Sequence, residues 1–190
     1  MLRHGQIQGY ETQRFIGRTD VPLDETGRSQ ALFWKKALAR IQFDSIYTST
    51  LSRCRETAAI ICPLSQKKEA KQNIYFDDRL NEINLGTWDG QSFGHIKAAM
   101  PELFDQRGKE IRQFCPPEGE SFADLYERVS PFFKNLCQNL AAPVLVITHS
   151  GVIRVMLCQY LGLNPTQLLT IKPGYGDLFV LEKTSLDQER

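Results

Sequence analysis

Two hydrophobic patterns alternate along the chain. In four segments apolar residues recur every three or four positions, which predicts amphipathic helices over 24–40, from about 52 to 62, from 121 to about 140, and over 152–161. Between them lie short apolar runs that predict strands at 46–48, 74–76, 143–147 and 178–181. The run 143–147 is continuously apolar, as in a central strand of a parallel sheet. Strands that alternate with helices predict an α/β fold with a mostly parallel sheet and right-handed crossovers.

Local signals add detail to three of the helices. The buried face of the first should consist of Ala31, Trp34, Leu38 and Ile41. The third should open with a capping box, because Asp124 stands three residues after Ser121. Its buried stripe should comprise Phe122, Leu125, Val129, Phe132, Leu136 and Leu140. We expect Pro131 to kink this helix or to mark a boundary, and Gly162 to stop the last helix.

The composition of the chain argues against several classes of function. A chain of 190 residues suits one domain, 1–190, and its net charge of +1 favours neither a nucleic acid nor a membrane as a partner. Five cysteines without a Cys-x-x-Cys spacing favour neither a disulfide framework nor a zinc site, and they agree with a reducing cytoplasm. Neither a secretory leader nor an apolar run of about 18 residues is evident, so secretion and membrane spanning have no support.

The candidate chemistry begins at His4, which stands in the tripeptide Arg3-His4-Gly5. A second turn of this kind, His149-Ser150-Gly151, follows the apolar run 143–147. A neutral imidazole is a good nucleophile toward phosphorus near pH 7, the glycine would let an anion approach the backbone, and Arg3 would hold that anion. The tripeptide Arg3-His4-Gly5 alone is more readily interpreted as an ordinary polar turn, so the phosphoryl-transfer interpretation depends on the rest of the chain.

Two further segments supply groups that phosphoryl transfer needs. Arg53 follows the predicted strand 46–48 and enters the first turn of the next helix, which is a natural anion site. Glu82 lies in the irregular segment 80–90, which contains two glycines. His4, Arg53 and His149 all come just after strands, and parallel sheets bind ligands beyond the carboxyl ends of their strands. One pocket could therefore hold all three side chains.

In this order the four segments resemble the histidine phosphatase superfamily, in its phosphoglycerate-mutase-like branch. The resemblance runs from Arg3 to about Arg154. It implies a three-layer α/β/α sandwich, with His4 as the nucleophile that carries the phosphoryl group and Glu82 as general acid and then base. It also implies that the substrate is bound by Arg3, Arg53 and His149, with Tyr10, Arg14, Gly17 and Ser150 as further candidates. Gln6 and Tyr10 stand where relatives usually have an acidic residue and an asparagine, which leaves the phosphate contact of Tyr10 open.

The implied reaction is hydrolysis of a small phosphomonoester without a metal or another cofactor. Only the 66 residues 83–148 separate Glu82 from His149, whereas mutases of the family carry an extra segment there. A short lid shields phosphohistidine poorly from water, which favours hydrolysis. The segment 91–120 is the expected lid or substrate-specificity segment. The loop 116–122, Arg128 and Ser150 look most like the α-ribazole-5'-phosphate phosphatases of cobalamin assembly.

Several alternatives stay open beside this interpretation. One is a broad small-molecule phosphatase or a phosphoglycerate-mutase-like enzyme, and another is an inactive phosphoester-binding protein. A homodimer is also left open. Only Met1 and Leu2 precede Arg3, although the resemblance places the nucleophile at the end of a central strand. We therefore expect the natural protein to begin several residues upstream.

Other conspicuous residues are assigned structural roles. His95 should face solvent, and Asp77 and Asp78 should end a strand in a turn rather than bind a metal. Cys54 should be a small buried side chain rather than a reactive thiol. Core packing, rather than stacking on a substrate, is expected for Trp88, Phe93, Phe104 and Phe114.

Overall fold

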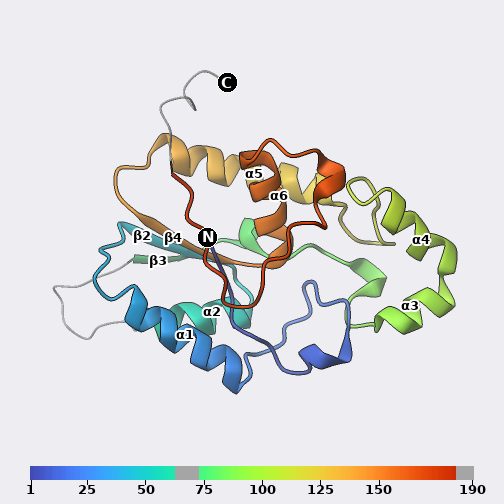
Figure 1. Cartoon of the computed structure of the whole chain (residues 1–190), viewed down its shortest axis with the longest axis horizontal. Helices are drawn as coiled ribbons and strands as arrows, with labels where there is room; N and C mark the ends of the chain where they lie inside the picture. The colour runs from blue at the N-terminus through green and yellow to red at the C-terminus, as the bar shows by residue number, and fades with distance from the viewer. Residues whose placement is uncertain (63–72, 183–190) are drawn as a thin grey trace.

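A parallel sheet forms the centre of the protein (Figure 1). The computed structural model describes residues 1–62 and 73–182, and within them the sheet has four strands. The strands are β1 (Leu2–Arg3), β2 (Ser45–Thr48), β3 (Asn73–Phe76) and β4 (Val144–Thr148), in the spatial order β1-β4-β2-β3. Ile46 of β2 pairs with Leu145 of β4 on one side and with Ile74 of β3 on the other. Because all these pairs are parallel, the carboxyl ends of the strands meet at one edge of the sheet.

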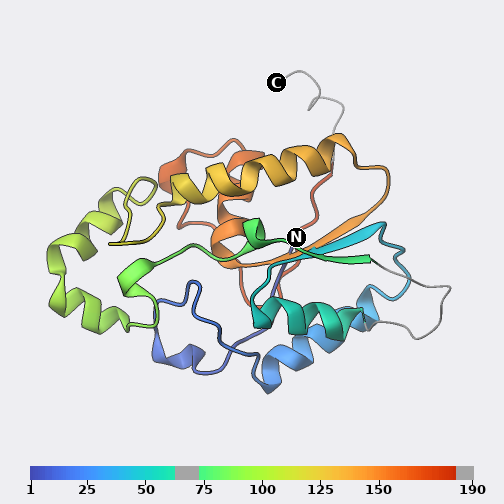
Figure 2. The same cartoon turned by 180° about the vertical axis from the view of Figure 1, so that it is seen from behind.

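Helices cover both faces of the sheet (Figures 1 and 2). α1 (Glu25–Ala37) and α2 (Ser52–Ile61) pack together on one face, and α5 (Phe122–Gln138) and α6 (Ser150–Tyr160) pack together on the other. Leu145 and Ile147 of β4 belong to the core beside α1 and α2, whereas Val146 belongs to the core beside α5 and α6. A strand that is buried on both faces needs a continuous apolar run, as 143–147 provides. The predicted three-layer α/β/α sandwich is confirmed.

The segment 91–120 extends the molecule at one end, to the right in Figure 1. It contains α3 (Phe93–Ala99) and α4 (Pro101–Lys109). Ser92 caps α3 by accepting a hydrogen bond from the His95 backbone amide (3.1 Å). Pro101 begins α4, where proline is well tolerated because the first backbone amides of a helix have no hydrogen-bond partner within it. Short 3-10 helices lie at Tyr10–Thr12, Asp78–Leu80, Gly86–Trp88 and Pro165–Gln167.

The predicted helices are present with shifted ends. α1 begins after Asp24, whose carboxylate accepts a hydrogen bond from the Gly27 amide (2.7 Å), and it ends at Ala37. Ile41 therefore lies outside the helix and is 40 % exposed, so its assignment to the buried face was wrong. Gly162 follows α6 with a φ of +62°, the left-handed geometry that lets a glycine end a helix there.

α5 begins at the predicted capping box. Ser121 Oγ accepts a hydrogen bond from the Asp124 amide (3.1 Å), and the Asp124 carboxylate accepts one from the Ser121 amide (2.9 Å). Pro131 lies inside this helix rather than at a boundary, and Leu140 lies beyond its end at Gln138. The buried residues of α5 are the predicted Phe122, Leu125, Val129 and Phe132, together with Phe133.

β1 is a two-residue strand between β4 and the segment 177–179. Leu2 is fully buried, the Arg3 amide donates to the Asp177 carbonyl (3.0 Å), and the Phe179 amide donates to the Met1 carbonyl (2.8 Å). Leu178 makes only a single antiparallel bridge to Leu2. The prediction of a strand at 178–181 was therefore wrong, because this segment covers the edge of β1 without forming a regular ladder.

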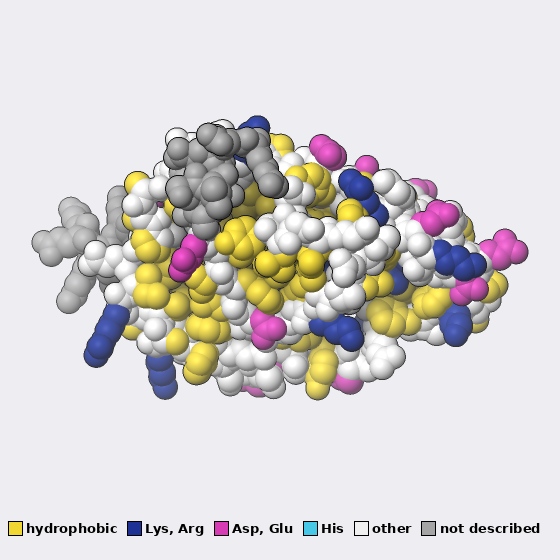
Figure 3. Space-filling view, turned by 45° about the horizontal axis from the view of Figure 1, so that its top comes forward, with side chains coloured by type: hydrophobic (Ala, Val, Ile, Leu, Met, Phe, Trp, Pro, Cys, Tyr) yellow, Lys and Arg dark blue, Asp and Glu magenta, His cyan; other side chains and the backbone are white. Residues whose placement is uncertain are grey.

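The surface agrees with the balanced composition. On the face shown in Figure 3, acidic and basic side chains are interspersed. Within residues 1–62 and 73–182, no helix has the length and apolar character needed to cross a membrane.

Candidate active site

Three strands bring the predicted catalytic side chains to one place. His4 follows β1, Arg53 lies in the first turn of α2 after β2, and His149 follows β4 as the residue that caps α6. The rings of His4 and His149 meet edge to face, with centroids 5.0 Å apart. Arg53 Nε donates a hydrogen bond to His149 Nδ1 (3.2 Å). The three side chains that sequence reasoning grouped are thus neighbours.

His4 offers one ring nitrogen for chemistry. Its Nδ1 lies 2.8 Å from the carbonyl oxygen of Gly5, and because a carbonyl can only accept, Nδ1 carries the proton. Nε2 then keeps its lone pair. The backbone therefore selects the tautomer in which Nε2 of His4 can act as a nucleophile.

Burial and positive neighbours keep both histidines neutral. Loss of hydration lowers the pKa of His4 well below its ordinary value, and the charges of Arg3 and Arg53 lower it further. Burial also lowers the pKa of His149 well below its ordinary value, with Arg53 as the next cause. His4 is 3 % exposed and His149 is fully buried. At neutral pH both side chains are therefore uncharged imidazoles.

His149 holds Arg53 in position. Because its Nδ1 accepts from Arg53, its Nε2 carries the proton and donates to Ser49 Oγ (2.7 Å). Ser49 Oγ donates in turn to Asn81 Oδ1 (2.6 Å). Both ring nitrogens of His149 are engaged, so a hydrogen bond from His149 to a bound substrate, the role implied by the resemblance, requires the exchange of one of these bonds.

Arg53 is fully buried and is fixed by backbone carbonyls. Its two terminal nitrogens donate to the carbonyls of Thr19 (2.8 Å) and Gly17 (2.6 Å). The Gly17 amide donates to the Asp89 carboxylate (2.9 Å), which ties this turn to the segment 80–90. Gly17, a predicted substrate-binding residue, thus contacts Arg53 and does not line the cavity described below.

Arg3 retains an unused donor. One terminal nitrogen donates to the Pro173 carbonyl (2.7 Å), and the guanidinium carbon lies 3.7 Å from the ring centroid of Tyr175. Its Nε is buried and has no hydrogen-bond partner among the described residues. Such a donor is costly unless an acceptor reaches it. Tyr175 also contacts the His4 ring, with centroids 5.6 Å apart, so it borders both side chains.

Glu82 is held at the amino end of α6. Its Oε1 accepts hydrogen bonds from the backbone amides of Ile83 (3.0 Å) and Gly151 (3.0 Å). A side chain at position 151 would collide with this carboxylate, which explains the glycine in His149-Ser150-Gly151. Glu82 is 8 % exposed and lines the cavity. Its carboxyl group can therefore exchange a proton with a ligand bound there.

Gly5 has a packing role that the sequence did not reveal. Its Cα lies against the backbone of Gly27 in the first turn of α1, where a Cβ would overlap that backbone. The Gly5 amide donates to Thr57 Oγ1 of α2 (3.3 Å). The glycine therefore lets the turn that carries His4 pack closely against two helices.

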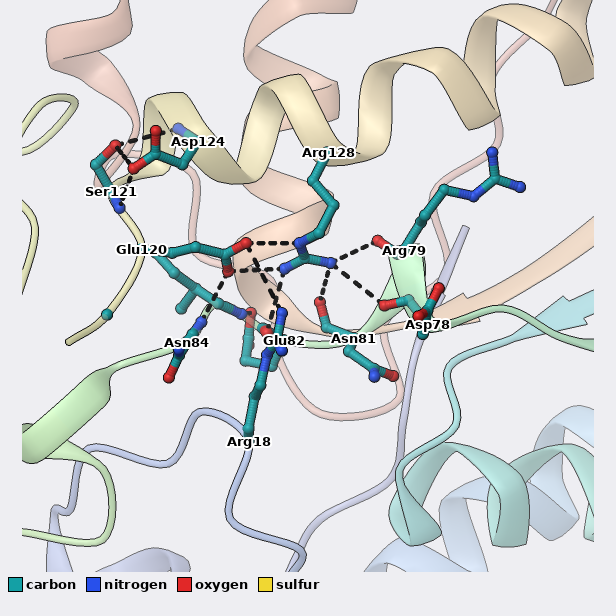
Figure 4. Close-up of polar contacts among 12 residues, drawn as sticks. Arg18, Asp78, Arg79, Asn81, Glu82, Asn84, Glu120, Ser121, Asp124 and Arg128 are labelled. Carbon is teal, nitrogen blue, oxygen red and sulfur yellow. Dashed lines mark hydrogen bonds and ion pairs between the residues drawn. The ribbon is translucent and has the colours of Figure 1, made fainter.

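Arg128 of α5 holds the loop that carries Glu82 (Figure 4). One terminal nitrogen donates to the carbonyls of Arg79 (2.7 Å) and Asn81 (3.1 Å), and the other lies 3.4 Å from the Glu82 carbonyl. On its other side, Arg128 forms a bidentate pair with the carboxylate of Glu120 (2.6 and 2.9 Å). The guanidinium thus connects α5 to three backbone carbonyls of the segment 79–82, a role that the sequence did not reveal.

A cavity of about 260 Å³ opens beside this site. Of the residues predicted to bind substrate or act in catalysis, those that line it are Arg3, Tyr10, Arg14, Glu82 and Ser150. Tyr10 and Arg14 are exposed, whereas Ser150 lies in the first turn of α6 and is buried. His4, Arg53 and His149 are not part of the lining and lie deeper, as their burial shows.

Sequence reasoning did not name four polar residues of the cavity wall as site residues: Arg107, Glu120, Arg154 and Tyr175. Arg154 lies four residues after Ser150 on α6, so helical spacing places both on one face and could have identified it. Arg107 and Tyr175 lie in segments that carry no motif. The aromatic side chain of Phe93 is 40 % exposed and lines the cavity, so its assignment to the core was wrong.

The remaining structural assignments hold. His95 is exposed on α3, Trp88 and Phe114 are buried, and the Asp77 carboxylate accepts a hydrogen bond from the Arg79 amide (3.0 Å) in a turn. Cys54 is fully buried against His149, and burial raises the pKa of its thiol to about 12. Phe104 packs half-buried against the core. Within the described ranges, no group of three or more His, Cys, Asp or Glu side chains is arranged to hold a metal ion.

Known proteins are similar to this chain in sequence and in fold. The family model described as the histidine phosphatase superfamily (branch 1) matches residues 1–187. A 2,3-bisphosphoglycerate-dependent phosphoglycerate mutase of Bartonella henselae is 29% identical over 181 residues, which cover 93% of this chain and 87% of that protein. An adenosylcobalamin/alpha-ribazole phosphatase of Salmonella typhimurium is 26% identical over 181 residues, or 93% of this chain and 85% of that protein. The solved structure of Bacillus stearothermophilus YhfR matches with a TM-score of 0.80 at 30% identity, over 92% of this chain and 85% of that one.

Proposed function

Because the chain belongs to branch 1 of the histidine phosphatase superfamily, we propose that it hydrolyses phosphomonoesters through a phosphohistidine formed on His4. The observation that carries the proposal is the state of His4. Its proton is fixed on Nδ1 by the Gly5 carbonyl, and its low pKa keeps Nε2 unprotonated at neutral pH. A nucleophile toward phosphorus needs this free lone pair.

The neighbouring groups complete the chemistry. Nε2 of His4 attacks phosphorus while the bond from phosphorus to the ester oxygen breaks, and the carboxyl group of Glu82 gives its proton to the departing oxygen. The Glu82 carboxylate then takes a proton from a water molecule, which attacks phosphorus, breaks the N–P bond and releases phosphate. Arg3, with its buried unused Nε, and Arg53 supply positive charge for the phosphoryl oxygens. This proposal needs no metal ion.

We favour hydrolysis over phosphoryl transfer between sugars, because only the residues 83–148 separate Glu82 from His149. α-Ribazole 5'-phosphate is the first specific substrate to test. The loop 116–122 resembles that subfamily, and the Salmonella relative supports the choice. Within this proposal the segment 91–120 sets substrate specificity, since Phe93, Arg107, Ile111 and Phe114 all line the cavity. We also keep the cytoplasm as the proposed location.

The test is covalent labelling of the purified protein. A substrate with a radioactive phosphoryl group should leave an acid-labile, base-stable label on the wild type. His4→Ala should lose both the label and turnover of p-nitrophenyl phosphate. His95→Ala is the matched control, because His95 is exposed on α3, and it should keep both. Turnover by His4→Ala would overturn the covalent mechanism.

A panel that includes α-ribazole 5'-phosphate and 3-phosphoglycerate decides among the alternatives. Hydrolysis of one substrate well above the others would identify the specificity, and similar rates throughout would favour a broad phosphatase. Binding without turnover of any substrate would favour an inactive phosphoester-binding protein.

A further inference from the structure

The cavity wall carries two arginines beyond those of the proposed phosphate site. Arg107 comes from α4 and Arg154 from α6, and both line the same cavity as Arg3 and Glu82. Both side chains are partly buried. Burial, and after it the charge of Arg154, lowers the pKa of Arg107, so the two positive charges are close enough to repel each other. The fold therefore holds two like charges together at one cavity.

Arg154 lies next to the groups assigned to the chemistry. Its Nε donates to the Ile171 carbonyl (2.8 Å), which anchors the guanidinium to the segment after α6. Burial lowers its pKa, while the nearby charges of Glu82 and Arg3 act in opposite directions. Among the described residues Arg154 forms no ion pair with a carboxylate. Its terminal nitrogens thus remain as donors for a ligand.

Arg107 has even fewer partners. Its guanidinium carbon lies 5.3 Å from the ring centroid of Phe15, and in the described part of the chain it makes neither a hydrogen bond nor an ion pair. A cation that is partly removed from water without an anion costs free energy. A bound anion would offset that cost for both arginines.

The other charged residues of the wall do not neutralise this pair. The lining contains four arginines (Arg3, Arg14, Arg107 and Arg154) but only two glutamates, Glu82 and Glu120. The carboxylate of Glu120 is already bound by Arg128, and that of Glu82 is held by backbone amides of Ile83 and Gly151. The cavity therefore has positive charge in excess of what one phosphoryl group beside Arg3 and Arg53 would use.

We propose that Arg107 and Arg154 bind a second anionic group of the substrate, a carboxylate or a phosphate, so that the preferred substrate is a small phosphomonoester with two anionic groups. The inference rests on the proposed function, because it assigns the transferred phosphoryl group to the site of Arg3 and His4. Guanidinium groups bind either anion with two parallel hydrogen bonds. α-Ribazole 5'-phosphate has its phosphate as the only anionic group and would leave this pair unoccupied. The inference therefore favours a doubly anionic phosphomonoester over the α-ribazole ester named above as the first specific substrate to test.

The test compares substrates that differ in one group. Glycerol 3-phosphate and 3-phosphoglycerate have the same carbon skeleton and phosphate position, but the second has a carboxylate where the first has a hydroxymethyl group. Glycerol 1,3-bisphosphate carries a second phosphate instead. We expect the wild type to favour one of the two doubly anionic compounds by ~10- to 100-fold in kcat/KM over glycerol 3-phosphate, the range for hydrogen bonds to charged groups. The preferred compound distinguishes a carboxylate from a phosphate as the second group.

Three arginine variants locate the effect. Arg107→Gln and Arg154→Gln should each reduce the preference, mainly through KM, while activity toward glycerol 3-phosphate falls much less. Arg112→Gln is the matched control, because Arg112 is exposed and does not line this cavity, and it should keep the wild-type preference. Equal kcat/KM values for the three compounds in the wild type, or an unchanged preference in both cavity variants, would overturn the inference and leave the proposed phosphatase activity intact.

Binding provides a readout that does not depend on turnover. Dissociation constants for the three compounds are measured calorimetrically with His4→Ala, which cannot form the phosphoenzyme. A doubly anionic compound should bind at least ~10-fold more tightly than glycerol 3-phosphate, and Arg107→Gln in that background should remove the difference. If this preference holds while the wild type hydrolyses none of the compounds, the subsite stands and the proposed function fails. If binding shows no preference, the subsite is refuted.

Discussion

Mild acid should destabilise this protein through His4 and His149. An unfolded histidine takes up a proton with a pKa of about 6.5. In the folded protein, burial and the neighbouring arginines hold the pKa of both residues well below that value. Below about pH 6.5 the unfolded chain therefore binds more protons than the native state, and the free energy of unfolding falls as the pH falls.

The magnitude follows from linkage. Each histidine that stays neutral in the native state contributes a slope that approaches about 1.4 kcal/mol per pH unit below its unfolded pKa. Between pH 7.5 and 5.5 this amounts to about 1.4 kcal/mol for each residue, or about 3 kcal/mol for the pair. That loss is a large share of the roughly 5–15 kcal/mol that stabilise a typical domain.

Urea unfolding at pH 7.5, 6.5 and 5.5, in buffers free of phosphate, measures the effect. Comparison of the wild type with His4→Gln and with His149→Gln cancels other titrating groups, such as the buried Met1 amine, whose pKa burial lowers to about 6. Each substitution should remove about 1.4 kcal/mol of the pH dependence over this range. His95→Gln is the comparison substitution, because His95 is an exposed histidine on α3. If His4→Gln and the wild type lose stability in parallel, His4 is not held neutral and the argument for its nucleophilicity fails.

Two further predictions concern Glu82, the group proposed to transfer the proton. Glu82→Gln should slow hydrolysis of alkyl phosphates far more than that of p-nitrophenyl phosphate, whose leaving group needs no proton; equal slowing of both would remove Glu82 from this role. Arg128→Met should lower kcat by ~100-fold with little change in KM, because the loop that carries Glu82 loses its anchor on α5. Arg79→Met, at an exposed side chain beside the same loop, is the control and should keep the wild-type kcat. A kcat for Arg128→Met equal to that of Arg79→Met would show that the hydrogen bonds of Arg128 to this loop do not position Glu82.

The sequence predicted the layers of the fold well because its strongest signals are periodic. The apolar run of β4 and the heptad-like spacing in α5 each follow from burial on defined faces, which leaves a pattern in the chain. The segment 178–181 is also an apolar run, but it lies beside β1, which has only two residues. It therefore has too few backbone partners to form a regular ladder of hydrogen bonds. Apolar content alone does not reveal the length of the neighbouring strand.

The sequence predicted those residues of the candidate site that lie in short motifs directly after strands. It did not predict the contacts that depend on how remote segments of the backbone fold together. His4, Arg53 and His149 come together because parallel strands end at one edge. The functions of Gly5 and Gly17 depend instead on contacts with Gly27 and with Arg53, which are remote in the chain. Tyr175 lies in a loop without a pattern, and only the folded chain brings it beside Arg3.

The short segment 177–179 covers the outer edge of β1. It satisfies the Arg3 amide and the Met1 carbonyl on the side of β1 away from β4. A chain cut after Gly176 would expose these groups as an open edge that can pair with a second molecule. The same cut would leave β1 paired with β4 alone, so self-association and a loss of support for the turn that carries His4 would arise together. A segment to which no chemistry is assigned thereby links the prevention of self-association to the position of His4, the proposed nucleophile.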